Sequence, residues 1–193
     1  MSDEKQLDKT FVSRPTIPIV EKTLDKMDKP LPEIIRPYLE KHTKPITHAD
    51  LVVQARMFLL HTEGCNPVFI EQGSGYEKPD VIGWRDNLSF VIECKISKTD
   101  LKADSSKVFR QEENLGMGEQ RYYLITTALF SEIRGCIEKY IPEKFGLIIY
   151  GDRLGNGCRN RIRIGKSGDF TANLREERKF LRARILEVQR YGK

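Results

Sequence analysis

Two short motifs near the middle of the sequence place acidic and basic side chains where they could act together. The segment 88–96 (LSFVIECKI) alternates like a strand, so Glu93 and Lys95 project from one face, roughly 7 Å apart, opposite an apolar face. Pro79-Asp80 opens the preceding strand candidate, and only the turn-forming RDN separates the two candidates. Antiparallel pairing would therefore bring Asp80, Glu93 and Lys95 together at one sheet edge.

Two carboxylates beside an ammonium suit hydrolysis assisted by a metal ion. Their hard oxygens favour Mg²⁺ or Mn²⁺, which keep several waters and accept a phosphate oxygen. Lys95 could hold an attacking water or help to deprotonate it; desolvation lowers its pKa, whereas nearby carboxylates raise it. The alternative is a solvent-facing strand, on which an exposed Glu–Lys pair contributes only about 0–1 kcal/mol.

These residues resemble the motif of the PD-(D/E)xK nuclease superfamily. The resemblance covers about residues 48–150, and the runs ECKISKTDLKADSSKVFRQ, GMGEQRYYL and FGLIIY are similar to small phage, prophage and bacterial members, including MmcB-like proteins assigned to DNA repair. It implies an α/β fold with a restriction-endonuclease-like αβββαβ core, whose mixed central sheet is flanked by helices. It also implies that Asp80 and Glu93 bind the metal, that the backbone carbonyl of Cys94 adds a ligand, and that Lys95 positions the water.

Many members of that superfamily also place a carboxylate on the first helix. Here Val53 and Gln54 lie near that place, and Asp50 lies one turn earlier. Glu71 is the expected substitute as a metal ligand, because the first strand would bring it to the same sheet edge; Glu63 is a weaker choice. The alternative for Glu71 is a surface carboxylate at a strand end.

Basic and polar residues after the motif could contact a nucleic-acid backbone. Residues 151–193 hold 12 Lys and Arg against 5 Asp and Glu, whereas residues 1–150 hold 21 against 23, so the excess positive charge is C-terminal. The candidates are Ser97, Lys98, Lys107, Arg110, Arg121, Arg159, Arg161 and Arg163. The alternatives are a solvated helix face, on which Asp104 pairs with Lys107 or supports Lys95, and a basic turn without a partner.

The elements that must position these residues follow the order α-β-β-β-α-β, then α-β. Periodicity and turn residues predict a first helix that Thr47 caps and Gly64 ends, and a last helix that Asn173 caps. The first helix is expected at 48–62, and two further helices at 99–113 and 130–140. The strands are expected at 67–71, 79–84, 88–96, 122–126 and 145–150, with an edge strand at 161–164.

The chain has 193 residues, which favours one ordinary domain with extensions. Six of the nine prolines fall before residue 47, so 1–46 is expected to be an arm of short pieces, followed by the nuclease-like core at 47–150 and a basic extension at 151–193 that ends in a helix. Apolar stripes in the arm could dock on the domain, on a second copy in a homodimer, or on a protein partner.

No stretch approaches the roughly 20 apolar residues that cross a bilayer, and the first residues lack the apolar core of a signal peptide. The four cysteines are scattered, and His48 and His61 have no partner at ligand spacing, so the first are interpreted as reduced thiols and the histidines as polar helix residues. We therefore expect a cytoplasmic protein, or one in the host cytoplasm if a phage encodes it, with no membrane partner.

The leading hypothesis is a Mg²⁺- or Mn²⁺-dependent deoxyribonuclease that hydrolyses phosphodiester bonds in DNA. One alternative is a catalytically inactive nucleic-acid-binding module of the same fold. The other is a phage-type factor that acts on a protein through the N-terminal arm.

Overall fold

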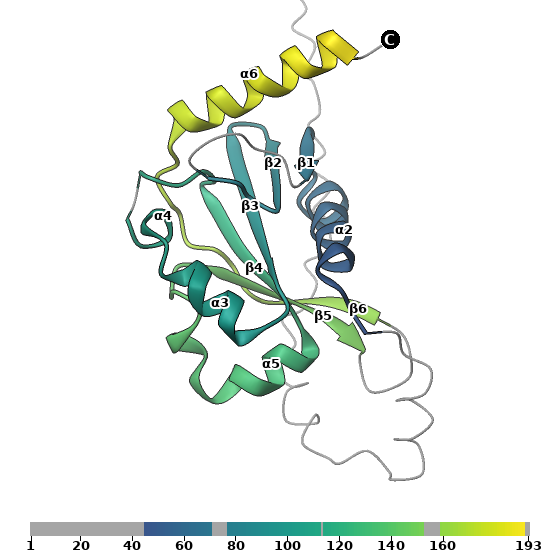
Figure 1. Ribbon diagram of the computed structural model, residues 1–193, viewed down its shortest axis with the longest axis vertical. Helices are drawn as coiled ribbons and strands as arrows, with labels where there is room; N and C mark the ends of the chain where they lie inside the picture. The colour runs from purple at the N-terminus through teal and green to yellow at the C-terminus, as the bar shows by residue number, and fades with distance from the viewer. Residues whose placement is uncertain (1–44, 71–76, 113, 153–158, 192–193) are drawn as a thin grey trace, which may run out of the picture.

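The computed structural model describes residues 45–70, 77–112, 114–152 and 159–191 (Figure 1). These residues form a mixed α/β structure, in which a six-stranded sheet has helices on both of its faces. The prolines and apolar stripes of the expected arm before residue 45 lie outside the described ranges, as does Glu71.

The sheet has the strand order β1-β2-β3-β4-β5-β6. The first three strands form the antiparallel meander that the sequence predicted, β4 runs parallel to both β3 and β5, and β6 pairs antiparallel with β5 at the far edge. The strands are β1 (Val68–Ile70), β2 (Val81–Arg85), β3 (Leu88–Lys95), β4 (Gln120–Thr126), β5 (Gly146–Asp152) and β6 (Arg159–Gly165).

The helices divide between the two faces of this sheet. α2 lies on one face, while α3 and α5 lie on the other, and α6 crosses near the β2–β3 turn (Figure 1). The helical segments are α2 (His48–Phe58) with the π-helical turn η2 (Leu59–Glu63), α3 (Lys98–Ser105), α4 (Val108–Gln111), α5 (Thr127–Ile133) with the 3₁₀ segment η3 (Arg134–Lys139), and α6 (Leu174–Tyr191).

α2 begins at the residue that the sequence indicated. Thr47 Oγ1 accepts a hydrogen bond from the Asp50 backbone N–H at 3.2 Å, and Asp50 Oδ2 accepts one from the Thr47 N–H at 2.8 Å. This reciprocal capping satisfies two N–H groups that the first turn of a helix leaves unpaired. The helical run ends at Gly64, whose φ of 71° lies in the left-handed region that favours glycine. The cap fixes the orientation of the first turn, which carries His48.

The alternation of β3 sorts its residues between two environments. Phe90, Ile92 and Cys94 face α2 and pack with its apolar residues in the larger core cluster. Glu93 and Lys95 face the side covered by α3, where Tyr123 of the neighbouring strand is also buried. The charged residues of the motif are thus buried between the sheet and a helix.

The single helix expected at 99–113 is instead two short helices. Ser97 caps α3 by accepting a hydrogen bond from the Asp100 N–H at 3.2 Å, and α3 ends at Ser105. Lys107 is extended, with φ −66° and ψ 138°, before α4 begins. Ser105 and Ser106 are weak helix formers, and each donates its hydroxyl to a backbone carbonyl three residues earlier, which favours the break. The break turns α4 back toward β3.

α6 begins after Asn173, whose Oδ1 accepts a hydrogen bond from the Glu176 N–H at 3.2 Å, as the sequence predicted. Its buried residue Phe180 packs with Ile82, Val91 and Met117 in a separate apolar cluster. No helix in the described ranges is long and apolar enough to cross a membrane.

Candidate active site

The structure brings the three motif residues together at one end of β2 and β3. Val81 pairs with Ile92, so Asp80, which directly precedes β2, lies beside the end of β3. Lys95 Nζ lies 3.3 Å from Glu93 Oε2 and 3.9 Å from Asp80 Oδ2. The antiparallel pairing expected from the sequence therefore produces the expected convergence, while the catalytic roles of these residues stay predictions.

Burial separates this arrangement from an ordinary surface ion pair. Glu93 is 2% exposed and Lys95 is 5% exposed, because α3 covers this part of the sheet. The Asp80 side chain is 18% exposed and lies on the solvent side of the group. The solvent-facing alternative for the Glu–Lys pair is therefore wrong, and Asp80 marks the side from which a ligand could enter.

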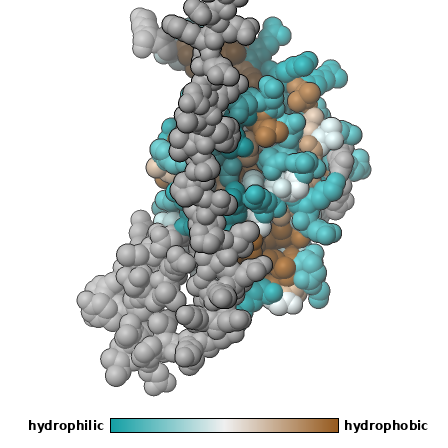
Figure 2. All heavy atoms as spheres, turned by 180° about the vertical axis from the view of Figure 1, so that it is seen from behind, coloured by the Kyte–Doolittle hydropathy of each residue, from teal (hydrophilic) through white to brown (hydrophobic). Residues whose placement is uncertain are grey.

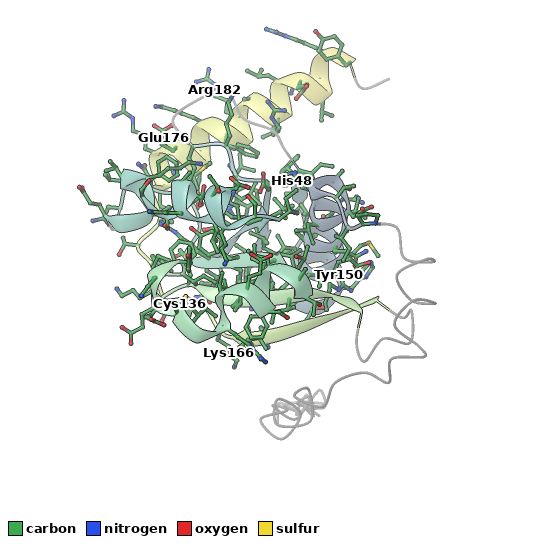
Figure 3. The ribbon with its side chains drawn as sticks, turned by 60° about the horizontal axis from the view of Figure 1, so that its bottom comes forward. His48, Cys136, Tyr150, Lys166, Glu176 and Arg182 are labelled. Atoms are coloured by element: carbon green, nitrogen blue, oxygen red, sulfur yellow. The ribbon has the colours of Figure 1, made fainter. Side chains whose placement is uncertain are left out.

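Asp80 is held by two further groups. Its Oδ2 accepts a hydrogen bond from the Cys94 backbone N–H at 2.7 Å and lies 3.3 Å from His48 Nε2. His48 stands in the first turn of α2 (Figure 3). The sequence interpretation of His48 as a polar helix residue missed this contact, since 32 residues separate it from Asp80. For Cys94, the expected role of its carbonyl as a metal ligand stays a prediction.

Arg110 joins three carboxylates behind Glu93. Its Nε donates to Asp104 Oδ2 at 3.0 Å, its Nη2 lies 2.5 Å from Glu93 Oε1, and its Nη1 contacts Glu77 Oε1. The Arg110 side chain is fully buried. The expected contact of Arg110 with a nucleic-acid backbone is therefore wrong; the guanidinium neutralises buried carboxylates, which would be costly to leave unpaired.

Asp104 of α3 closes the group from the helix side. It accepts hydrogen bonds from Tyr123 Oη at 2.9 Å and from Lys107 Nζ at 2.7 Å, and its Oδ1 lies 3.6 Å from Lys95 Nζ. Burial alone would raise the pKa of Asp104, but Arg110 and Lys95 hold that pKa well below its usual range. Asp104 is thus a fixed negative charge against Lys95, which agrees with the supporting role considered from the sequence.

Glu93 and Lys95, the two β3 residues of the motif, both have raised pKa values. Burial raises the pKa of Glu93 to about 7, even though Arg110 and Lys95 oppose this change. Burial also lowers the pKa of Lys95, but the surrounding carboxylates outweigh it, so this pKa lies above its ordinary value. Lys95 is therefore an ammonium at neutral pH, able to donate hydrogen bonds to a water rather than to remove its proton.

The donor set fits a divalent cation of the hard or borderline class. Glu93 Oε1 is buried, and Arg110 Nη2 lies 2.5 Å from it. In the described part of the chain no three His, Cys, Asp or Glu side chains surround a common point, but Mg²⁺ is commonly held by one or two carboxylates plus waters and substrate. The group contains one more carboxylate than cation: Glu77, Asp80, Glu93 and Asp104 against Lys95, Lys107 and Arg110.

The other acidic candidates do not add to this group. Glu71 lies outside the described residues, so its role as a metal ligand stays a prediction. Glu63, the weaker choice, lies at the other end of the helical run that starts with α2, where it pairs with Arg163 at 2.7 Å and with Arg85 at 3.5 Å. Asp50 caps α2.

Arg121 does not reach a phosphate in this structure. Its side chain is fully buried, and its Nε and Nη2 donate to the carbonyls of Gly118 and Gly116, both at 2.9 Å. The guanidinium also lies 4.4 Å from the centre of the Phe170 ring. The predicted nucleic-acid contact of Arg121 is therefore wrong, because the guanidinium holds the glycine-rich loop against β4.

The other nucleic-acid candidates whose side chains are described have structural partners, and their predicted contacts are left untested. Lys98 and Lys107 are partly exposed and pair with Glu132 and Asp104. Arg161 donates to the Gln54 carbonyl at 2.9 Å. Ser97 is the cap of α3, Arg163 pairs with Glu63, and the side chain of Arg159 lies outside the description.

Comparisons of the chain with protein-family models, with curated proteins and with solved structures gave no match. The geometry and charge of this group are therefore the evidence from which a function can be inferred.

Proposed function

We propose that this protein is a Mg²⁺- or Mn²⁺-dependent nuclease that hydrolyses phosphodiester bonds in DNA. The observation that carries the proposal is the position of Lys95 Nζ, 3.3 Å from Glu93 and 3.9 Å from Asp80, in a buried group whose outer carboxylate, that of Asp80, is partly exposed. Two carboxylates and an ammonium at one point can hold a cation and a nucleophile together.

Each side chain has a separate task in this proposal. Asp80 and Glu93 would hold the ion, which when bound polarises the phosphate and neutralises charge that develops during attack. Lys95 donates hydrogen bonds to the attacking water and orients it in line with the bond that breaks. Asp104 and Arg110 position these groups from behind, since one faces the Lys95 ammonium and the other contacts the Glu93 carboxylate.

The order of elements also supports the proposal. α2, the meander β1–β3, α3 and the parallel strand β4 follow the αβββαβ order of the restriction-endonuclease-like core that the motif resemblance implies. In that arrangement the motif lies where β2 begins and β3 ends, beside the start of α2.

A cleavage assay with purified full-length protein tests this function. We expect Mg²⁺ or Mn²⁺ to support cutting of plasmid, linear or single-stranded DNA, and EDTA to stop it. Lys95→Ala should lower the rate by about 10²-fold or more, because the water loses its orienting donor. Lys139→Ala, which changes an exposed lysine of η3, should cut at the wild-type rate. Cutting that survives Lys95→Ala unchanged contradicts the assignment.

One observation favours a second candidate, a nucleic-acid-binding module that does not cut. Both oxygens of Glu93 face a cation, since Oε1 lies 2.5 Å from Arg110 and Oε2 lies 3.3 Å from Lys95. Such pairing competes with metal binding. The module predicts DNA affinity that falls steeply with salt and no cleavage with any divalent ion, which gel-shift and cleavage assays on the same preparation distinguish.

A further inference from the structure

We propose that the outward face of α6 binds the phosphate backbone of double-stranded DNA. This face carries Arg175, Arg178 and Arg182, which are all exposed and are called the α6 row below. At 3.6 residues per turn, the three side chains leave the helix within an arc of about 60° and along about 10 Å of its axis. Glu177 and Phe180, the buried residues of α6, lie on the opposite side of the helix. The α6 row therefore points away from the domain.

The acidic residues of α6 do not neutralise this row. Glu176 pairs with Lys179 at 2.6 Å, and Glu187 pairs with Arg184 at 2.5 Å. Glu177 is buried and accepts hydrogen bonds from β2 and from the loop before β4. Within the described ranges the three arginines of the row form no ion pair, so their charge is available to an anionic partner.

The fold holds the row in a defined position. Asn173 caps the start of α6, and Glu177 and Phe180 attach its first turns to the sheet. The α6 row alternates along the helix with these two buried residues, so it stands on the attached part of α6 rather than on its exposed end. Little conformational entropy of the backbone is lost when such a preorganised surface binds its partner.

The chemistry of the row matches a nucleic-acid backbone. A DNA duplex carries one negative charge per about 1.7 Å of its axis, and a guanidinium can form two parallel hydrogen bonds with one phosphate. Release of the counterions condensed on the duplex favours binding whatever the base sequence. A row of unpaired arginines therefore fits the backbone of DNA rather than its base edges.

The apolar residues of α6 argue against an anionic membrane as the partner. A helix that lies on a bilayer buries its apolar face in the lipid. In α6 the exposed residues Val188 and Tyr191 continue the side on which Phe180 packs against the domain, opposite the α6 row. A bilayer that took up these two side chains would thus lie on the domain side of the helix and would not meet the arginines.

The α6 row is separate from the candidate active site. Phe180 packs near the β2–β3 turn, whereas the site lies at the opposite ends of these strands. The inference therefore goes beyond the proposed nuclease function, since a protein that binds DNA without cutting it would use the same surface. It also allows binding to be measured without metal and without cleavage.

Fluorescence anisotropy of a short labelled DNA duplex, titrated with the full-length protein in EDTA at several salt concentrations, tests the inference. We expect the combined change Arg175→Ala, Arg178→Ala and Arg182→Ala to weaken binding by about tenfold or more. The slope of log affinity against log salt should become less steep by about 2–3, because up to three phosphate contacts are lost. Replacing the same arginines by lysine keeps the charge and should leave the affinity within about threefold of the wild type.

The matched control removes three positive charges elsewhere. Lys139, Lys144 and Lys166 are exposed, and none of them lies on α6. Figure 3 shows Lys166 and Arg182 at opposite ends of the described structure. Lys139→Ala, Lys144→Ala and Lys166→Ala combined should change the affinity by less than about threefold, because charges farther away than the Debye length, about 10 Å at 0.1 M salt, are largely screened.

Four results would overturn the inference. They are a wild-type protein that does not bind the duplex, unchanged affinity in the arginine-to-alanine variant, an equal loss in the lysine control, and binding through the row to phosphatidylglycerol vesicles but not to DNA. The nuclease proposal is judged separately by cleavage. Binding through α6 by a protein that cuts no DNA with Mg²⁺ or Mn²⁺ supports this inference and refutes the nuclease, whereas cutting by a protein whose affinity does not depend on the row does the reverse.

Discussion

Burial of opposite charges decides how each residue of the candidate site behaves. Arg110 has three carboxylate partners that reach it from separate parts of the chain, and Asp104 receives Tyr123, Lys107 and Lys95. Removing one partner from such a group costs roughly 3–5 kcal/mol, because the remaining charge stays buried. Each charged side chain of the group is therefore held in place by its partners. Glu93 is the member whose pKa lies near neutral pH, at about 7.

The pH dependence of stability should report on Glu93. Without metal, the folded protein keeps the Glu93 proton up to about pH 7, because burial outweighs Arg110 and Lys95, whereas an unfolded chain loses it near pH 4.5. Between these two pH values the folded state binds more protons than the unfolded chain, and the neighbouring carboxylates of Asp104 and Asp80 add to this difference because they also raise the pKa of Glu93. The contribution of Glu93 to stability therefore falls as the pH rises through this range.

Glu93→Gln removes that contribution. In EDTA, we expect the melting temperature of the variant to rise relative to that of the wild type as the pH increases from 5 to 7.5. The change in the difference should be equivalent to about 2–3 kcal/mol of unfolding free energy. Glu132→Gln, which changes a largely exposed carboxylate on α5, should follow the wild type throughout. A difference between Glu93→Gln and wild type that stays constant, or reverses sign, across this range would show that Glu93 is not protonated in the folded state.

Some residues of the candidate site could be identified from the sequence, whereas others were missed. Glu93 and Lys95 could be found because strand alternation is a local property, and Asp80 because a short turn fixes how two strands pair. The contacts of His48 with Asp80 and of Arg110 with Glu77 span 32 and 33 residues, and no local period encodes them. Arg121 was assigned to a phosphate because neither its charge nor its neighbours in sequence indicate burial.

At the level of elements, the loop between α4 and β4 locks the site from one side. The Met117 N–H donates to Glu77 Oε2 at 2.5 Å, and the Gly118 N–H donates to Glu177 Oε1 of α6 at 2.8 Å. Residues 116–118 of this loop are buried although two of the three are glycines. The strands and most helices were predicted within a few residues. The break after α3 was missed, because the hydrogen bonds by which the Ser105 and Ser106 side chains end α3 leave no sign in the apolar periodicity of the sequence.

Gly118→Ala should therefore destabilise the protein. Gly118 has φ +84°, and an added Cβ would lie 2.8 Å from Val91 Cγ2 of β3. Strain and overpacking together should lower the free energy of unfolding by about 1–3 kcal/mol, measured by urea denaturation. Gly135→Ala is the control, since nothing lies within 4 Å of its Cβ position, and it should be neutral or slightly stabilising. Equal effects of the two substitutions would mean that the loop adapts freely.

At the scale of the whole molecule, α6 is attached to the domain through only part of its length. Glu177 and Phe180 are its buried residues, and Glu177 Oε2 accepts a hydrogen bond from Trp84 Nε1 at 3.2 Å. The later residues Ile185, Val188 and Tyr191 are exposed. Seen from behind, the described surface is largely hydrophilic, and its apolar residues form separate patches (Figure 2). The sequence predicted this helix and its cap, but not which of its turns contacts the rest of the domain.

Replacing apolar residues along α6 should reveal this uneven attachment. Phe180 lies against Phe69 and Trp84, with ring centres 5.7 and 6.1 Å away, so Phe180→Ala leaves a cavity and should cost about 3–5 kcal/mol of unfolding free energy. Val188 is 65% exposed, and Val188→Ala should change stability by less than about 0.5 kcal/mol.

The same variants also test whether α6 is coupled to the candidate site. Phe180 packs near the β2–β3 turn, whereas the candidate site lies at the opposite ends of these strands. At a low temperature at which Phe180→Ala is still folded, the variant should therefore bind Mn²⁺ with wild-type affinity. A large loss of stability in Val188→Ala would instead show that the end of α6 is packed in solution, and a loss of Mn²⁺ affinity in folded Phe180→Ala would show that α6 is coupled to the site through β2 and β3.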